Sequence, residues 1–199
     1  MTSDKRKWFA ERAKLFEYYV NNMSDKIDEV NMIFHEQEYG WVDTDIVVNK
    51  NNTFSFSISF VYQPFDDILK WLENLAEKRY CEQEVSTYSV CINAEDEYYI
   101  FVYEPDIGFI RNDAGIFYVY ADECAGEKWV QKIALHAYCC KTDLIRNFYK
   151  TLTDFAMLMN AREDYRNEWI GNDREEIDFQ KRFHSSKIIN YLSLCKNRK

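Results

Sequence analysis

Two short segments, YYIFVY at residues 98–103 and IFYVY at residues 116–120, decide the fold of this 199-residue chain. Both consist of aromatic and β-branched residues, which favour the pleated surface of a β-strand. Neither segment alternates apolar with polar residues. A strand with one face in water alternates in this way, whereas a strand covered on both faces does not. The two segments are therefore predicted to be central strands, with helices supplying the cover on each side.

Further strands are expected before and after this pair. Residues 41–49 and 53–62 alternate apolar with polar side chains and are predicted to form a hairpin. The first of them carries Asp43 and Asp45, and it is predicted to be an edge strand because charge discourages unwanted pairing there. The remaining strands are predicted at residues 85–93, 97–104, 115–121 and 128–139. The last segment also has helical spacing, so a helix is the alternative there.

Helical periodicity occupies most of the other residues. Helices are predicted over residues 4–38, from Pro64 onward, over residues 142–160 and after Ser185 or Ser186. Ser24 is the expected point of any break in the first helix, because its hydroxyl could cap a second segment. Thr142 is the predicted N-cap of the third helix, and Trp71 is expected on the flank of the second.

The order of these elements predicts the fold class. Strands that are joined by short turns pair in the antiparallel sense. We therefore expect a single α+β domain over residues 1–199, with one mainly antiparallel sheet of five to six strands covered by amphipathic helices. Helical segments are expected at its two ends, at residues 1–39 and 161–199.

Composition narrows the class of partner. The net charge is −9, from 34 acidic and 25 basic residues, which argues against a nucleic-acid-binding surface because phosphate contacts need clustered lysine and arginine. The same charge permits a basic protein partner. The first residues lack the apolar core of a signal peptide, and no apolar run approaches a membrane span of about 18 residues. A cytoplasmic protein without membrane contact, with its six cysteines reduced, is expected.

Motifs of catalysis and cofactor binding give little support to an enzyme. His136, Cys139 and Cys140 fall within five residues and are residue types that bind zinc, but neighbouring cysteines on a strand point to opposite faces. No second pair of ligands follows, and no glycine-rich phosphate loop or nucleophile elbow is present. No metal and no cofactor is therefore expected, and no catalytic residue is assigned.

Acidic turns beside tyrosine-rich strands form the candidate interaction surface. Tyrosine buries a large area at low entropic cost and is common in protein interfaces. The alternative is that these tyrosines belong to the core. The residues predicted to contact a partner are Asp66, Asp67, Glu95, Asp96, Glu97, Tyr99, Tyr103, Tyr118, Asp122 and Glu123.

Three segments resemble the small acidic bacterial α+β proteins that act as immunity partners in polymorphic toxin systems. They are PFDDILKWL at residues 64–72, TDLIRNFY at residues 142–149 with Leu152 and Phe155, and SKIINYL at residues 186–192. The resemblance implies a non-catalytic protein that blocks a toxin by direct binding, and it assigns no functional residue. The alternative function is an enzyme or a small-ligand-binding protein with a site assembled from distant residues.

Overall fold

The structure, a computed structural model, describes residues 3–22, 26–38, 40–59, 64–77, 89–95, 97–105, 113–125, 128–162 and 178–196. These ranges contain seven strands: β1 (Val30–Glu38), β2 (Trp41–Val48), β3 (Asn52–Ser59), β4 (Ser89–Ala94), β5 (Glu97–Pro105), β6 (Ala114–Ala125) and β7 (Lys128–Cys140). They also contain five helices: α1 (Ser3–Asn22), α2 (Pro64–Glu77), α3 (Lys141–Ala161), α5 (Phe179–Arg182) and α6 (Ser186–Lys196). Ser24 and residues 163–177 lie outside the described residues, and so do the predictions made on them.

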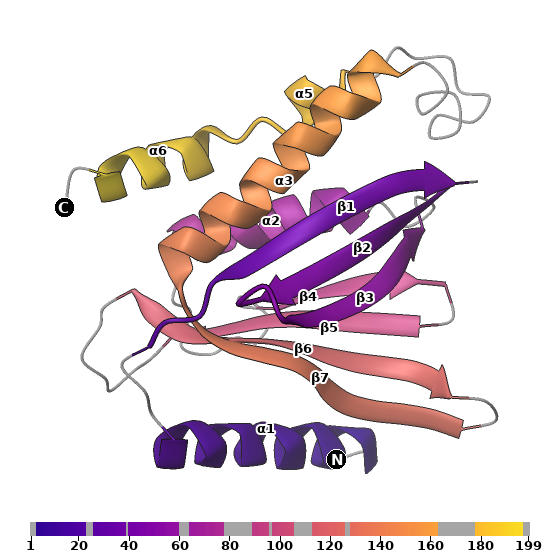
Figure 1. Cartoon of the computed structure of the whole chain (residues 1–199), viewed down its shortest axis with the longest axis vertical. Coiled ribbons are helices and arrows are strands. Elements are labelled where there is room, and N and C mark those ends of the chain that lie inside the picture. Colours follow the sequence, from indigo (N-terminus) through magenta and orange to yellow (C-terminus); the bar gives the residue numbers. More distant parts are fainter. Residues whose placement is uncertain are drawn as a thin grey trace.

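The strands form two antiparallel sheets, one in the order β1-β2-β3 and one in the order β4-β5-β6-β7 (Figure 1). The α+β class is confirmed, but the predicted single sheet of five to six strands is wrong for the described ranges. Each sheet is built from strands that follow one another in the chain, and α2 separates the two sets. Helix α1 lies across the four-stranded sheet from the other helices (Figure 1).

The aromatic segments quoted first are β5 and β6, and they occupy the centre of the four-stranded sheet as predicted. Phe101 and Phe117 point into the main core, which α2 and α3 cover. Their neighbours Val102 and Tyr118 point to the opposite face, where they pack against Leu15 of α1. Successive side chains of a strand point to opposite faces, so an uninterrupted apolar run needs this cover on both sides.

The prediction that Trp71 lies on the flank of α2 is wrong. Its side chain is 2% exposed. Its ring centroid is 6.2 Å from those of Phe101 and Phe148 and 6.3 Å from that of Phe117. Trp71 precedes the buried Leu75 by four residues, so the two share one side of the helix. The buried stripe of α2 is broad because the helix lies between the four-stranded sheet and α3.

The prediction of helix over residues 4–38 is correct only as far as Asn22, where α1 ends. It is wrong for Val30–Glu38, which form strand β1. Val30 and Met32 are buried and Phe34 is half-buried, and all three point into the main core. Residues 30 and 34 also fit the spacing of a helical turn, which is why the pattern was ambiguous. The burial alternates with a period of two, as it does in a strand with one wet face.

Strand β2 is central in its sheet, between β1 and β3, and the prediction that it is an edge strand is wrong. Its two aspartates point to the exposed face and find partners on the neighbouring strands. Asp43 accepts a hydrogen bond from the Ser57 hydroxyl at 2.5 Å, and Asp45 Oδ2 lies 2.8 Å from His35 Nε2. The two aspartates of β2 therefore indicate the solvent-exposed face of the sheet and not an edge strand.

Helix α3 covers the outer edge of β1. The Asn147 amide donates a hydrogen bond to the Val30 carbonyl at 2.9 Å, and the Thr151 hydroxyl donates one to the Met32 carbonyl at 2.7 Å. These bonds occupy backbone acceptors that an open edge would offer to another chain. The helix itself begins at Lys141, and Thr142 is not its N-cap.

Asp113, which precedes β6, supplies the missing cap of α3. Its carbonyl accepts a hydrogen bond from the Lys141 amide at 2.7 Å, and its carboxylate accepts one from the Thr142 amide at 3.2 Å. A carboxylate at this position satisfies free amides and complements the helix dipole. The predicted start of a helix after Ser185 or Ser186 is confirmed by α6, and Ser185 caps it, because Ser185 Oγ accepts a hydrogen bond from the Ile188 amide at 3.3 Å.

Residues 128–140 form strand β7, so the preferred prediction for this segment is confirmed. A bulge interrupts its pairing with β6 between Val119 and Tyr120, which pair with Leu135 and Ile133. The extra residue reverses the side-chain alternation. Leu135 therefore faces the main core, whereas Ile133 packs in the cluster under α1. A regular strand would place both residues on one face, and the bulge separates them.

Candidate functional site

The three predicted interface tyrosines are buried. Tyr99 is 4% exposed, Tyr103 is 1% exposed and Tyr118 is 0% exposed. Tyr118 lies under α1, where its hydroxyl donates to Glu104 at 2.7 Å, and Tyr103 lies in the main core. The two-sided cover that explains the apolar strands encloses Tyr103 and Tyr118, whereas Tyr99, although it packs in the main core, borders a groove.

Most of the predicted acidic residues are scattered over the molecule. Asp66 forms a two-pronged ion pair with Arg182, whose Nε donates at 3.0 Å, so this carboxylate joins α2 to α5. Asp122 accepts a hydrogen bond from the Gln131 amide on the neighbouring strand at 3.0 Å. Asp67 is exposed in the first turn of α2. Asp96 and the side chain of Glu123 lie outside the described residues.

Glu95, Glu97 and Tyr99 are the predicted residues that the fold brings together. They line a groove of about 550 Å³ where the β4–β5 turn meets the outer part of β3. We call this feature the acidic groove; its lining residues are Trp41, Ser55, Phe56, Ser57, Ala94, Glu95, Glu97 and Tyr99. Sequence reasoning missed Trp41 and Phe56, because they belong to the other sheet.

Aromatic rings and carboxylates lie side by side in the acidic groove. The ring of Tyr99 packs 4.7 Å from that of Phe56, and its hydroxyl donates to Glu97 Oε2 at 2.5 Å. The Ser59 hydroxyl donates to Glu95 Oε1 at 3.4 Å. Glu95 has a positive φ of 63°, which the sharp turn between β4 and β5 requires. No lysine or arginine occurs among the described residues that line this groove.

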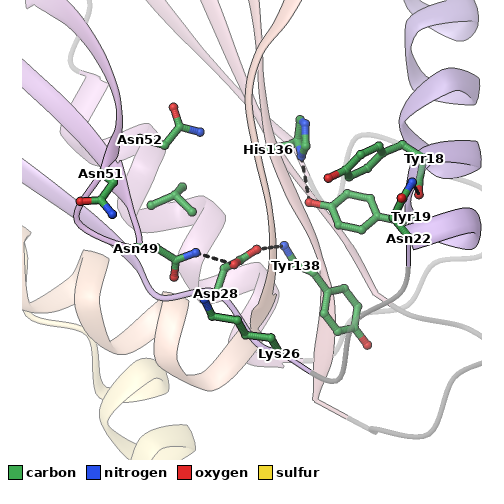
Figure 2. A pocket seen from close by; sticks show the side chains of 11 residues that line it. Tyr18, Tyr19, Asn22, Lys26, Asp28, Asn49, Asn51, Asn52, His136 and Tyr138 are labelled. Carbon is green, nitrogen blue, oxygen red and sulfur yellow. Dashed lines mark hydrogen bonds between the residues drawn. The ribbon is translucent and has the colours of Figure 1, made fainter.

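A second concave feature, of about 480 Å³, lies between α1, β7 and the β2–β3 turn (Figure 2). We call it the tyrosine–histidine pocket. Its lining residues are Tyr18, Tyr19, Asn22, Lys26, Asp28, Val48, Asn49, Asn51, Asn52, His136 and Tyr138. Sequence reasoning named His136 as a possible zinc ligand but did not connect it with α1 or the β2–β3 turn, and Asp28 fell in a segment expected to be helical.

Hydrogen bonds fix two walls of the tyrosine–histidine pocket (Figure 2). The Tyr19 hydroxyl lies 2.9 Å from His136 Nδ1 and shares a hydrogen bond with it. Burial lowers the pKa of His136 and raises the pKa of Tyr19, so both side chains are neutral near pH 7. On the other side, Asp28 accepts hydrogen bonds from the Asn49 amide at 2.6 Å and from the Tyr138 backbone at 2.9 Å.

No family model, curated protein or solved structure matches this chain. In the described ranges, His, Cys, Asp and Glu side chains do not gather in groups of three or more that could hold a metal ion. None of the described helices is both long enough and apolar enough to cross a membrane.

Proposed function

We propose that this chain is a non-enzymatic protein-binding domain whose acidic groove receives a basic side chain of its partner. The observation that carries the proposal is the pairing of two carboxylates, Glu95 and Glu97, with the aromatic rings of Trp41, Phe56 and Tyr99 in one groove. A guanidinium group can bond to a carboxylate in a two-pronged manner while its flat face stacks on an aromatic ring.

The charge of the whole chain supports the same partner. At a net charge of −9, the domain attracts cationic proteins over long range and repels acidic ones. Asp43 and Asp45 lie on the exposed face of β2 and add negative charge to the sheet that also contributes Trp41 to the groove. Charge of one sign around a groove mainly raises the rate of encounter and selects the partner.

We infer that the partner is a basic toxin that acts in the same bacterial cytoplasm, which this domain neutralises by direct binding. The inference follows the resemblance of residues 64–72, 142–155 and 186–192 to immunity proteins of polymorphic toxin systems. It is also consistent with a groove that offers complementary charge without an evident catalytic group. The direct test is whether one basic protein binds at a fixed ratio.

The experiment compares three forms of the tagged protein for retention of a partner from its native cells. The wild type is expected to retain one basic protein stoichiometrically, and the variant Glu95→Lys/Glu97→Lys is expected to lose it. Glu17→Lys is the matched control, because Glu17 is an exposed acid on α1, remote from the groove.

Affinity of the purified pair then decides the proposal. Each lost bond to a charged group weakens binding by about 10–100-fold, from a contribution of about 1.5–3 kcal/mol. The Glu17 variant should bind within about twofold of the wild type. Equal affinity of the groove variant and the wild type, or the absence of any stoichiometric partner, would contradict the proposed function.

A further inference from the structure

We propose that the tyrosine–histidine pocket is a binding site for a neutral polyhydroxylated ring, carried either by a free sugar or by a nucleoside. The pocket is distinct from the acidic groove, and the proposal does not depend on protein binding. Its volume of about 480 Å³ lies within the range of small-molecule sites, about 300–1,000 Å³.

The pocket is held in shape before any ligand arrives. Asn49 donates to Asp28, and its side-chain oxygen accepts a hydrogen bond from the Glu29 amide at 3.0 Å. The Asp28 amide in turn donates to the Tyr138 carbonyl at 2.7 Å. These bonds join the β2–β3 turn to β7, so a ligand would lose little binding energy in ordering this wall.

The charges around the pocket disfavour an anion. Asp28 contributes a carboxylate to the wall, which offsets the ammonium group of Lys26 in the same lining. Helix α1 ends at Asn22, which also lines the pocket, and the C-terminal end of a helix carries partial negative charge. His136 adds no positive charge near neutral pH, because burial keeps its imidazole neutral.

A cation is disfavoured by a different set of contacts. Each carboxylate oxygen of Asp28 already accepts one hydrogen bond from the protein, which leaves less of its acceptor capacity for a cation. Lys26 lines the same pocket and brings its own ammonium group. The remaining class of ligand is neutral and polar.

Two planar amides and a set of aromatic rings then specify the kind of neutral ligand. Asn51 on the β2–β3 turn and Asn52 at the start of β3 are exposed, and each amide can donate and accept at once, which fits a pair of neighbouring hydroxyls. The rings of Tyr19, His136 and Tyr138 lie on the opposite side (Figure 2). An aromatic ring offers an apolar surface for the C–H face of a sugar ring.

Nuclear magnetic resonance titration of the full chain tests the proposal. The probes are glucose, galactose and N-acetylglucosamine as free sugars, and adenosine and uridine as nucleosides. Saturable shifts are expected at the backbone amides of Asn51, Asn52 and Tyr138 with one of the two groups of probes. Shifts with sugars alone identify a free sugar as the source of the ring, and shifts with nucleosides alone identify a nucleoside.

Two variants separate a built site from weak surface binding. Asn52→Ala is expected to weaken the bound probe about tenfold, as for the loss of one or two hydrogen bonds. Asn190→Ala, at an exposed position on α6, should leave binding unchanged. The proposal is overturned if none of the five probes shifts these amides, or if Asn52→Ala binds as well as the wild type. The variant Glu95→Lys/Glu97→Lys should bind the probe as the wild type does. A wrong proposal for the tyrosine–histidine pocket can therefore be told apart from a wrong proposal for the acidic groove.

Discussion

Replacing Glu104 with glutamine tests how α1 is held on the four-stranded sheet. Glu104 Oε1 accepts hydrogen bonds from Arg12 Nε at 2.6 Å and from the Tyr118 hydroxyl at 2.7 Å. Its Oε2 accepts a third, from Arg12 Nη2 at 2.5 Å. Glutamine keeps the shape of the side chain but removes the charge and turns one acceptor into a donor. The hydrogen bond to Glu104 is also the main reason that the pKa of Arg12 is raised.

The size of the effect follows from the burial of the pair. A hydrogen bond to a charged group contributes about 1.5–3 kcal/mol when it is shielded from water. The Arg12 side chain is 37% exposed and that of Glu104 is 16% exposed, so solvent screens part of this energy. Tyr118 keeps an acceptor in the glutamine oxygen. We therefore expect the free energy of undocking α1 to fall by about 1–2 kcal/mol.

Hydrogen exchange of the α1 amides measures this undocking. Helix α1 is also held by the apolar cluster around Leu15, by the bond between Tyr19 and His136 and by ring contacts of Tyr18 and Tyr19 with β7, so few interactions retain it and it should open before the sheet unfolds. A loss of 1–2 kcal/mol speeds exchange by about 5–30-fold. Amides at the centre of β5 and β6 should exchange at the wild-type rate.

Glu11→Gln is the matched control for Glu104→Gln on the same helix. Glu11 pairs with Lys14 at 2.7 Å, but the Lys14 side chain is 71% exposed, so its loss should cost less than about 0.5 kcal/mol. A double-mutant cycle with Arg12→Met should give a coupling above about 0.5 kcal/mol. Equal exchange in the two glutamine variants, together with a coupling near zero, would refute the reasoning.

Three further changes test other parts of the fold. Burial lowers the pKa of His136, so its contribution to stability is complete above the unfolded pKa of about 6.5 and is lost as the pH falls toward the folded pKa. The free energy of unfolding, measured with urea, should fall less between pH 7.5 and pH 5.5 in His136→Gln than in the wild type. An equal fall in the two proteins would contradict this prediction. Lys50 has a positive φ of 66°, which strains a residue with a side chain. Lys50→Gly should therefore stabilise the hairpin by up to about 1 kcal/mol and raise the melting temperature. An unchanged or lower melting temperature would contradict backbone strain at Lys50. Trp71→Ala should cost about 3–5 kcal/mol by chemical denaturation, whereas a cost below about 1.5 kcal/mol would fit a flank position.

The fold class and much of the local structure could be predicted from the sequence. Patterns with a strong period correctly predicted a helix that begins at Pro64, and they predicted a helix over residues 142–160 close to the observed bounds of α3. The segment from Val30 to Phe34 fits two periods at once, and only pairing with β2 decides between them. The division into two sheets depends on which strands meet across α2, and local patterns do not carry that information.

The candidate sites were harder to predict, because each is assembled from distant segments. Glu95, Glu97 and Tyr99 were predicted on an acidic turn and the tyrosine-rich strand beside it, but their groove also needs Trp41 and Phe56 from the other sheet. The tyrosine–histidine pocket joins α1, the β2–β3 turn and β7. Asparagines in a turn are ordinary turn residues, so nothing in the sequence marked those of the β2–β3 turn as part of a site.

The dependence of β1 on α3 has a consequence for how the chain is made. Asn147 is 117 residues beyond Val30, the residue whose carbonyl it binds. At synthesis rates of about 5–20 residues per second, the ribosome needs roughly 6–23 s to add that length. The three-stranded sheet can form early, because its strands are consecutive, but its apolar face and outer edge then await a helix not yet translated. During those seconds the nascent chain should bind general chaperones most strongly through residues 30–59.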